Sequence, residues 1–395
     1  MTDAHDDLSE LIALFPDESN GWTIDWNGVQ ETAMRDYAHR MAQTRQNPEY
    51  HAEGDVWTHT RLVCEALADD PEFRALNPRK RQILFFAALL HDVGKIWRST
   101  LDPSGAIVSP GHARAGASDV RAFLWRELGL CGSGDRIDFR ESICALVRAH
   151  STPSFLETEP DWRRRLASLA SLAELAPSFS LNMLFTLARA DVNGRVSKSK
   201  RRALERVQFG AELAREAALY DAPPQFSSAR ARFLYLNGRE IDPTLPVYDE
   251  TWGEIVMLAG LAGVGKDYWI RQNTPDARVI SLDALRAELN VLNGEKEASV
   301  VELAIERGKD ALRKRTTFVW NATNLTRIYR DRITSLAHNY NASVRVVYLE
   351  TEWSENLRRN SARDAVVPQH ALEKMLLKFE PPTFVEAERV EWREN

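Results

Sequence analysis

The chain has 395 residues, of which 44% are hydrophobic and 27% charged, which is enough for two domains that each bury a core. Its formal net charge of −6 argues against a protein that coats nucleic acid through bulk charge, so any polyanion site must be local. Three widely spaced cysteines without a CxxC pair indicate neither a disulfide framework nor a thiolate zinc site. The acidic N-terminus lacks signal-peptide features and no apolar run approaches ~20 residues, so we expect a cytoplasmic protein without membrane contact.

Residues 54–220 carry a helical pattern almost throughout, because apolar residues recur three and four positions apart in segments such as RQILFFAALLHDVGK, RESICALVRAH and LNMLFTLARAD. Stretches such as LDPSGAIVSPG interrupt the pattern and separate the helices. We therefore predict that residues 1–221 form an all-α domain. Residues 222–250 contain APP, SS, NG and further prolines, which favour a connector that wraps or docks rather than a helix.

The hydrophobic period changes after the connector. Short apolar, β-branched runs, namely EIVMLAG, ARVISLD, TTFVWNATN and SVRVVYLE, alternate with helical segments. Such alternation is typical of βαβ units, whose strands pair in a parallel sheet. The sequence therefore predicts a multidomain protein in which the all-α domain is followed by an α/β domain with a parallel sheet over residues 251–395.

A phosphate-binding loop follows the first of these strands in LAGLAGVGKDYW. Gly260, Gly263, Gly265 and Lys266 fit the pattern G-x-x-x-x-G-K, and Val264 lies inside the loop. Glycines let backbone N–H groups face phosphates, the following helix offers its positive end, and the lysine reaches the β- and γ-phosphates. We predict a site for ATP or another nucleoside triphosphate.

Asp267 follows the lysine where the general pattern has a serine or threonine hydroxyl that ligates Mg²⁺. A carboxylate is also an oxygen ligand, so Mg²⁺ can bind it directly or through water. Capping of the helix is the alternative, since an acidic side chain is favourable at a helix N-terminus. The sequence leaves these roles of Asp267 open.

Two further motifs bring charged residues to the predicted nucleotide crevice. VISLDALRAEL places Asp283 at the carboxyl end of the next strand, with Arg286 three residues on, on the same helical face. A carboxylate there can accept the proton of a hydroxyl that attacks the γ-phosphate, or it can cap a helix. RRNSARDAVVP carries Arg358, Arg359 and Arg363, a spacing that suits either a lid over the phosphates or a solvated basic face.

The motifs LAGLAGVGKD, ISLDALR, NATNLTRIYR and RRNSARDAVVP resemble, in this order and spacing, the P-loop polynucleotide 5′-kinase family of bacteriophage and bacterial RNA-repair kinases. The resemblance covers about 120 residues. It implies that Asp283 is the general base on the 5′-hydroxyl and that Arg286 holds the adjacent phosphate of the acceptor. It also implies that Arg363 is the lid arginine at the ATP phosphates, beside Lys266 in its phosphate role.

The NATN motif matches this family only in part. Thr323 and Asn324 match, and the resemblance places them at the nucleic-acid end. Ala322 stands where the phage-type enzyme has an aspartate. Because that carboxylate would orient the acceptor arginine, we expect acceptor affinity or preference to differ from that of the family.

The helical half contains an ordered series of histidines and aspartates. LLHDVGK puts His91 and Asp92 side by side, so an imidazole and a carboxylate can bind one cation from adjacent positions. Each residue taken singly is more often a satisfied core or surface residue than a ligand. The other members lie near helix ends or on helices with an apolar face; they are His59, His112, His150 and Asp191.

The series H…HD…H…H…D resembles the HD metal-dependent phosphohydrolase superfamily over most of residues 50–215. The resemblance implies a dinuclear site for a divalent transition metal such as Mn, Ni, Co or Zn. The implied ligands of the first metal are His59, His91, Asp92 and Asp191, and those of the second are His112 and His150 with Asp92 bridging. Lys95, one helical turn past His91, either holds a phosphate oxygen during catalysis or faces solvent.

A local basic stretch follows Asp191 in RADVNGRVSKSKRR. Its side chains suit contact with a polyanion beside the predicted metals, and a solvated helix start is the alternative. The members of the stretch are Arg195, Lys198, Lys200, Arg201 and Arg202.

The two halves together resemble the bacterial HD-domain polynucleotide kinases, which combine an N-terminal 2′,3′-phosphoesterase with a C-terminal 5′-kinase. The resemblance implies an end-healing enzyme that acts on RNA or DNA ends with ATP and Mg²⁺ in the kinase, and a separate ligase is a possible partner. One alternative is a nucleotide phosphohydrolase fused to a small-metabolite kinase. Another is a non-catalytic regulator that senses nucleotides.

Overall fold

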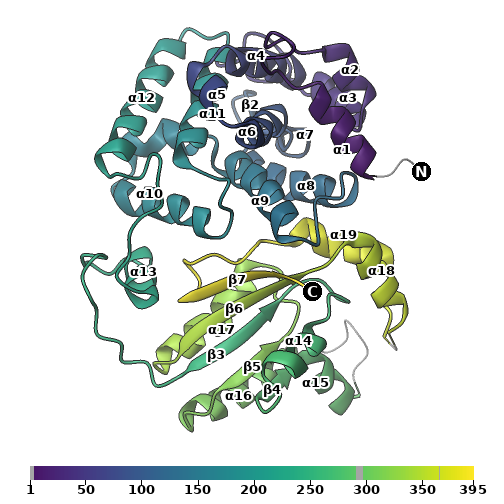
Figure 1. Ribbon diagram of the computed structural model, residues 1–395, viewed down its shortest axis with the longest axis vertical. Helices are drawn as coiled ribbons and strands as arrows, with labels where there is room; N and C mark the ends of the chain where they lie inside the picture. The colour runs from purple at the N-terminus through teal and green to yellow at the C-terminus, as the bar shows by residue number, and fades with distance from the viewer. Residues whose placement is uncertain (1–3, 291–296, 364) are drawn as a thin grey trace. The chain divides into compact units, whose positions relative to one another are not determined.

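The computed structural model describes residues 4–290, 297–363 and 365–395 (Figure 1). Its internal contacts divide the chain into two compact units. The first, which we call the helical unit, comprises Met1–Cys131 and Asp135–Pro224, and the second, the sheet unit, comprises Gly132–Gly134 and Gln225–Asn395. No helix in the described part of the chain is long and apolar enough to cross a membrane.

The helical unit confirms the predicted all-α fold. The segments with the helical period lie largely in helices of the structure, although residues 91–94 form a turn between α6 and α7, and η1 and η2 are short 3₁₀ helices. The elements are α1 (Ala4–Ala13), α2 (Trp26–Glu31), α3 (Arg35–Gln43), α4 (Val56–Ala68), α5 (Pro71–Ala75), α6 (Pro78–Leu90), α7 (Lys95–Arg98), α8 (His112–Arg126), α9 (Gly134–Ala149), η1 (Thr152–Thr158), α10 (Trp162–Ala170), η2 (Ser171–Glu174), α11 (Leu181–Gly194) and α12 (Lys200–Glu216).

Helix α6 is the central element of this core. Its residues from Ile83 to Leu90 are all buried, and α4 and α11 both pack against it. A helix that is apolar on every side is stable only when other helices surround it. The C-terminus of α6, where the HD pair follows, therefore lies inside the helical unit rather than on its surface.

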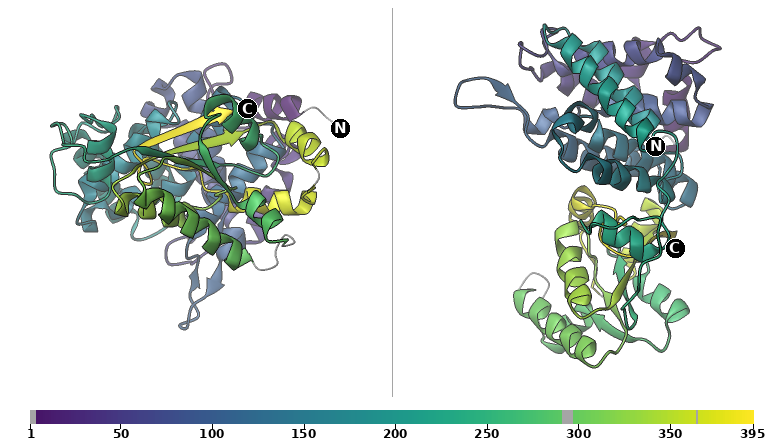
Figure 2. Two further views of the ribbon diagram at one scale, coloured as in Figure 1. Left: turned by 90° about the horizontal axis from the view of Figure 1, so that it is seen from below. Right: turned by 90° about the vertical axis from the view of Figure 1, so that its left-hand side faces the viewer.

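One segment of the helical unit differs from the prediction. LDPSGAIVSPG forms a short antiparallel hairpin of β1 (Thr100–Leu101) and β2 (Ile107–Val108), with Thr100 paired to Val108. Figure 2 shows this hairpin standing out from the helices of its unit. The Asp102 carboxylate accepts hydrogen bonds from the amides of Ser104 and Ala106, which closes the turn.

The sheet unit confirms the predicted α/β fold with a parallel sheet. All neighbouring strands pair in parallel, in the order β4-β5-β3-β6-β7. Its elements after the connector are β3 (Glu254–Ala259), α14 (Lys266–Asn273), β4 (Arg278–Ser281), α15 (Leu282–Glu288), α16 (Glu297–Arg313), β5 (Phe318–Asn321), α17 (Arg327–Asn339), β6 (Ser343–Glu350), α18 (Trp353–Ser361), α19 (Gln369–Lys378) and β7 (Arg389–Glu394).

The strand order places the phosphate loop at the point where the sheet changes direction. From β3 the chain builds β4 and β5 on one side, and then crosses to build β6 and β7 on the other. In open parallel sheets, ligands bind at the carboxyl ends of the strands at such a switch point. The glycine-rich turn after β3 occupies this position.

The predicted connector contains a helix that sequence reasoning did not expect. Helix α13 (Ala229–Leu236) begins at Ser228, whose side chain accepts a hydrogen bond from the amide of Ala231. Arg230 pairs with Glu388 at 2.6 Å, and Arg232 stacks on Phe384. The expectation of a segment without a helix was therefore wrong, whereas docking of the segment onto the sheet unit is observed.

Candidate functional site

The six predicted metal ligands converge at one place in the helical unit. His59 lies on α4, Asp191 on α11 and His112 at the start of α8, whereas the HD pair and His150 directly follow α6 and α9. All are buried except His112, whose side chain is 22% exposed. The helices thus bring together residues that are up to 132 positions apart in the sequence.

The ligand atoms form two groups that share Asp92. In the first group, His59 Nε2 lies 3.1 Å from Asp191 Oδ1, and His91 Nε2 lies 4.0 Å from the same oxygen. Asp92 Oδ2 lies 3.3 Å from His91 Nε2 and so faces this group. One candidate ligand atom each of His59, His91 and Asp191 lies within 4.8 Å of the others, and the same holds for Asp92, His112 and His150.

The second group uses the other oxygen of Asp92. Oδ1 of this carboxylate lies 3.4 Å from His112 Nε2 and 3.8 Å from His150 Nε2. The two imidazole nitrogens are 3.4 Å apart. A carboxylate that presents one oxygen to each of two ligand groups suits a bridging position between two cations.

Hydrogen bonds at Nδ1 fix the orientation of the histidine rings. The Nδ1 atoms of His91, His112 and His150 contact the carbonyl oxygens of Ala88, Ser109 and Val147 at 2.7, 2.9 and 2.8 Å. In each case the contact is to the residue three positions earlier. A partner at Nδ1 fixes the tautomer and leaves Nε2 as the basic nitrogen. These rings therefore present Nε2 to the centre of the site.

Burial and charge at the centre fit a metal site. His91 Nε2 and Asp92 Oδ1 are buried and have no hydrogen-bond partner among the described residues. Burial alone would raise the pKa of Asp92, but Lys95 and His91 lower it well below its ordinary value. Burial and His91 lower the pKa of His150 to about 4. An ionised carboxylate and a neutral imidazole are the forms that bind metals.

Two glycines allow the helices that carry the ligands to approach closely. A Cβ atom on Gly94, in the HDVGK turn, would lie 2.0 Å from the carbonyl oxygen of His112. A Cβ atom on Gly194 at the end of α11 would lie 2.7 Å from the amide nitrogen of Val63 on α4. Any side chain at either position would push apart elements that carry ligands of the site.

Two positively charged side chains, those of Lys95 and Arg195, pair with the acidic ligands of the site. Lys95 Nζ lies 2.6 Å from Asp92 Oδ2 and donates a hydrogen bond to Gln46 Oε1, also at 2.6 Å. Arg195 donates two hydrogen bonds to the carboxylate of Asp191. Lys95 is therefore not a solvated lysine, and of the basic stretch Arg195 reaches the site.

The remaining residues of that stretch stay at the surface. Lys200 Nζ donates a hydrogen bond to the carbonyl oxygen of Asn193, and Arg201 pairs with Glu205. Lys198 and Arg202 are exposed. They lie at the start of α12 or just before it, one turn or more from Arg195.

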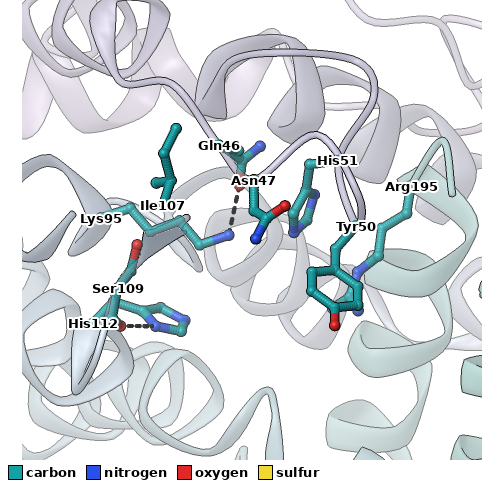
Figure 3. Close-up of a pocket in the computed structure, with 9 residues that line it drawn as sticks. All are labelled: Gln46, Asn47, Tyr50, His51, Lys95, Ile107, Ser109, His112 and Arg195. Carbon is teal, nitrogen blue, oxygen red and sulfur yellow. Dashed lines mark hydrogen bonds between the residues drawn. The ribbon is translucent and has the colours of Figure 1, made fainter. Parts of the chain in front are cut away.

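A cavity of about 240 Å³ opens above this cluster (Figure 3). Lys95, His112 and Arg195 line it on the side of the ligands. The 46–51 loop and the β1–β2 hairpin form its walls through Gln46, Asn47, Tyr50, His51, Ile107 and Ser109. Gln46, Asn47 and Tyr50 were not predicted, because the sequence around them carries no motif.

In the sheet unit, the turn after β3 has the geometry of a phosphate-binding loop. Gly260, Gly263 and Gly265 all have positive φ angles, of 144°, 86° and 90°. Lys266 Nζ donates hydrogen bonds to the carbonyl oxygens of Gly260 and Leu261 at 3.2 and 2.8 Å. Desolvation of this amine lowers its pKa to about 8.

Asp267 contacts a side chain that sequence reasoning missed. Asn321 ends β5 in register with Leu258 of β3, and its Nδ2 donates a 2.6 Å hydrogen bond to Asp267 Oδ1. Asp267 is exposed and lies in the first turn of α14, where its charge is favourable, and it makes no described hydrogen bond to a backbone N–H of this helix. A carboxylate held at the carboxyl edge of the sheet fits an oxygen ligand for Mg²⁺. Asn321 is the first residue of NATN, the only signal that could have indicated it.

Asp283 lies immediately beyond β4, where the sequence predicted it. The cap of α15 is Ser281, whose Oγ accepts a hydrogen bond from the amide of Ala284, so Asp283 is not the capping residue. Its exposed carboxylate binds Arg286 through one oxygen and lies 3.5 Å from Arg363 Nη2 through the other. Asp283 and Arg363 both act electrostatically on Lys266, so these charges share one site.

The three predicted lid arginines have different environments. Arg363 has a buried Nη1 with no hydrogen-bond partner among the described residues. Arg359 Nη1 would lie 3.3 Å from a Cβ atom on Gly265, so its guanidinium reaches the loop. Arg358 is 70% exposed and pairs with Glu355 of its own helix, which is the solvated alternative.

Thr323 and Asn324 support the loop in this structure. The carbonyl oxygen of Thr323 accepts a 2.9 Å hydrogen bond from the amide of Gly260. Asn324 is 7% exposed, and its Nδ2 donates a 2.6 Å hydrogen bond to the carbonyl oxygen of Leu258. In this structure the amide of Asn324 is thus buried against β3, and the predicted role of Thr323 and Asn324 at the nucleic-acid end stays a prediction.

Two asparagines of α18 fix the surroundings of the loop; no motif marked Asn356, whereas Asn360 lies within RRNSARDAVVP. Asn356 Nδ2 donates a 2.8 Å hydrogen bond to the carbonyl oxygen of Ala262. Asn360 exchanges two hydrogen bonds with the backbone of Val367, at 2.7 and 3.1 Å. The helix before Arg363 is thereby tied to the phosphate loop at one end and to the segment beyond Arg363 at the other.

Comparison with known protein families agrees with both halves of this description. Residues 56–177 match the HD domain, and residues 255–382 match the AAA domain. The first match spans His59, His91, Asp92, His112 and His150, and the second runs from β3 past α19. The residues at which the two sites were described thus lie mostly within the matched ranges.

Proposed function

We propose that this chain, which joins an HD domain to a P-loop kinase-like domain, heals the ends of a broken RNA strand in two reactions. The HD site removes a 2′,3′-cyclic, 2′- or 3′-phosphate, and the P-loop site phosphorylates a 5′-hydroxyl with ATP. Both products are needed at one break, because a ligase joins a 3′-hydroxyl to a 5′-phosphate. One polypeptide then corrects both ends left by nucleolytic cleavage, and a separate ligase seals them.

The single observation that supports this proposal most is the position of Asp283. Its carboxylate is exposed at the carboxyl edge of the sheet, it is not a helix cap, and it lies between two arginines. Arg286 on one side suits the phosphate next to the acceptor hydroxyl, and Arg363 on the other suits the transferring phosphate. A base between two phosphate-binding groups fits an acceptor that itself carries a phosphate.

The kinase reaction uses these residues as follows. Asp283 accepts the proton of the 5′-hydroxyl while that oxygen forms a bond to the γ-phosphorus of ATP and the bond to the β-phosphate breaks. Lys266 and Arg363 balance the negative charge of the phosphates, and ADP leaves. Asp267, held by Asn321, would bind Mg²⁺.

The HD reaction uses the six ligands and the cations beside them. Two divalent cations in such a site would clamp a phosphate ester and make a water molecule a better nucleophile. His59, His91 and Asp191 would hold one and His112 and His150 the other, with Asp92 between them. Lys95 and Arg195 are placed to bind phosphate oxygens. Water adds to phosphorus, one bond to a ribose oxygen breaks, and that oxygen takes up a proton.

A two-arm assay tests the proposal on the full chain. One arm offers a 5′-hydroxyl oligonucleotide with labelled ATP, and the other offers an RNA ending in a 2′,3′-cyclic phosphate with manganese, nickel or cobalt. Asp283→Ala should abolish only end-phosphorylation, and His91→Ala should abolish only phosphate removal. Asp276→Ala, an exposed aspartate in the same unit, is the matched control and should leave both reactions unchanged.

Other outcomes identify the alternatives. Phosphorylation of a nucleoside or another small metabolite, without any preference for a strand, would replace the first activity with a metabolite kinase. No turnover in either arm, with intact cellular activity of Lys266→Ala and Asp283→Ala variants, would indicate a nucleotide-sensing regulator. The ligase partner is tested by adding a nucleic-acid ligase to healed ends, where failure to seal would refute it.

A further inference from the structure

The cavity next to the HD ligands is lined in part by residues that have no role in metal binding or in the HD reaction. Its volume of about 240 Å³ is below the roughly 300–1,000 Å³ of sites for drug-sized ligands, so it suits a small ligand and not a duplex. The side facing the ligands carries Lys95 and Arg195, and none of the lining residues is a carboxylate. An anionic group therefore binds on that side.

Beside Arg195, the 46–51 loop presents an aromatic ring and an amide to the cavity. Tyr50 is 46% exposed although it lines the cavity, so one part of its ring is free to contact a ligand. Asn47 accepts a hydrogen bond from the amide of Glu49 through Oδ1, and its Nδ2 has no partner in the described part of the chain. Aromatic rings stack on nucleobases of any type, and a free amide can donate to a base edge.

The loop that carries Tyr50 is joined to the segment that carries Arg195. Ala52 donates a 2.9 Å backbone hydrogen bond to the carbonyl oxygen of Val196, and Ser197 Oγ donates to the carbonyl oxygen of Glu49 at 3.2 Å. The ring of Tyr50 and the guanidinium of Arg195 are thus held at one wall, and Figure 3 shows them there together.

The same segment leads away from the cavity into a basic surface. Lys198 and Arg202 lie three and seven positions after Arg195, and both are exposed. Phosphates that precede a strand end would meet these cations as the strand leaves the cavity. A free mononucleotide has no phosphates to place there, so this surface favours a strand.

We propose that the cavity holds the terminal nucleotide of a single RNA strand, with its terminal phosphate between Lys95 and Arg195 and its base against the ring of Tyr50. Lys198 and Arg202 then receive the phosphates that precede it. This inference rests on the proposed function of the HD site and names the part of the strand that the site recognises. It makes Tyr50 a substrate-binding residue that contacts the base and takes no part in the chemistry.

The test separates the base from the phosphate. Two RNA strands are compared, one ending in an ordinary nucleoside 3′-phosphate and one whose last residue is an abasic riboside 3′-phosphate. Tyr50→Ala should lower kcat/KM for the first strand by about tenfold, as expected for the loss of one stacked base, and leave the second unchanged. Tyr50→Phe should restore the wild-type value. Tyr248→Ala, an exposed tyrosine of the sheet unit, is the matched control.

A second readout is independent of turnover. A strand with a terminal 5-iodouridine 3′-phosphate is irradiated on the full-length protein, and the cross-linked peptide is identified by mass spectrometry. The peptide containing Tyr50 should carry the cross-link, and an excess of unmodified strand should suppress it. A double substitution of Lys198 and Arg202 by glutamate should raise KM for the strand and leave that for a nucleoside 2′,3′-cyclic phosphate unchanged.

The possible results distinguish failure of the base-binding site at Tyr50 from failure of the proposed end-healing function. If the wild type removes phosphate from both strands but Tyr50→Ala slows both equally, or the cross-link lies elsewhere, the base site is wrong and end healing stands. If the wild type hydrolyses free nucleotides and neither strand, the proposed function fails and the strand site fails with it.

Discussion

Glu53 and His59 make one close contact: Oε1 of the glutamate lies 2.8 Å from Nδ1 of the histidine. The opposite nitrogen, Nε2, faces Asp191 at 3.1 Å. The same glutamate oxygen lies 2.8 Å from His51 Nδ1, while Oε2 accepts a hydrogen bond from the amide of Val196. His59 is thus the one histidine of the centre whose Nδ1 faces a carboxylate rather than the carbonyl oxygen three residues earlier in the chain.

Removal of this carboxylate should weaken metal binding. In Glu53→Gln, the amide no longer draws the Nδ1 proton as strongly, so His59 becomes a poorer ligand and its ring is less fixed. We expect a loss of about 10- to 100-fold in metal affinity. Titration of metal-depleted protein with Mn²⁺ or Co²⁺ by calorimetry measures it. Glu49→Gln, on the same loop but without this contact, should bind metal like the wild type, and equal affinity of both variants would show that Glu53 positions nothing.

Gly94 should be irreplaceable for a steric reason. A methyl group there would meet the carbonyl oxygen of His112 and the backbone of Gly116, so α8 would have to move away from the HD turn. Overpacking of this kind costs about 1–3 kcal/mol, and here the contact is with backbone that cannot rotate away. Gly94→Ala should therefore lower the melting temperature and the metal content together.

Gly134→Ala provides the comparison for Gly94→Ala. Gly134 begins α9 and has open space around its Cα, so alanine there should leave stability unchanged or raise it slightly. Differential scanning calorimetry and metal analysis of both variants decide the point. Wild-type stability of Gly94→Ala would mean that the turn and α8 separate without cost.

The hydrophobic pattern of the sequence was sufficient to predict the helices and strands that form the two cores. The helical repeats around α6 and the apolar strands β3, β5 and β6 could be read from the chain, because their side chains are buried over several successive turns or residues. Strand β7 was missed because RVEWRE has no apolar run and lies at the edge of the sheet, with charged side chains exposed. Helix α13 was missed because prolines and glycine flank it on both sides.

The residues of the two candidate sites could be predicted only where they belong to a local sequence motif. Residues within dense local motifs, such as the HD pair and the P-loop lysine, could be named from the sequence. Residues that act through contacts across the fold could not, because no local pattern marks Glu53 or Asn356, and NATN marks Asn321 without indicating its contact to Asp267. Asn324 illustrates the converse, since its motif resembled a ligand site and its amide is bonded to the backbone of β3.

Glu141 should make the helical unit sensitive to acid. It accepts hydrogen bonds from Arg121 at 2.8 Å and from Arg140 at 2.8 Å, all within the core. Burial would raise the pKa of Glu141, but the two guanidinium groups lower it below its ordinary value. The charged glutamate therefore stabilises the fold above the pKa of the unfolded chain, and this stabilisation is lost as pH falls through the lower pKa of the folded protein.

Urea unfolding of Glu141→Gln at two pH values checks this expectation. Near neutral pH the variant removes the charged carboxylate that pairs with two buried arginines and should lose about 3–5 kcal/mol. At a pH below both pKa values the wild type has also lost the charge, so the difference should shrink. Glu127→Gln, at an exposed pair with Arg126, should change stability little at either pH. A difference that does not vary with pH would exclude titration of Glu141 as its cause.

Nucleotide binding should take up a proton at alkaline pH. The pKa of Lys266 is lowered to about 8 by desolvation in the loop, whereas the phosphates of a bound nucleotide favour the ammonium form and raise it. At about pH 7 the amine is mostly charged before and after binding. At about pH 9 it is mostly neutral in the free protein and must gain nearly one proton when ATP binds.

The affinity for ATP should consequently fall as pH rises above about 8, by at most about tenfold per unit. Calorimetric titration in two buffers with different ionisation enthalpies measures the proton directly, since the observed heats differ by the number of protons exchanged. Lys266→Arg carries a guanidinium that stays charged at about pH 9, so it should show no such uptake. Equal proton uptake in this variant and in the wild type would assign the proton to another group. Lys266 would then be charged before the nucleotide binds, and its pKa would not be lowered in the free protein.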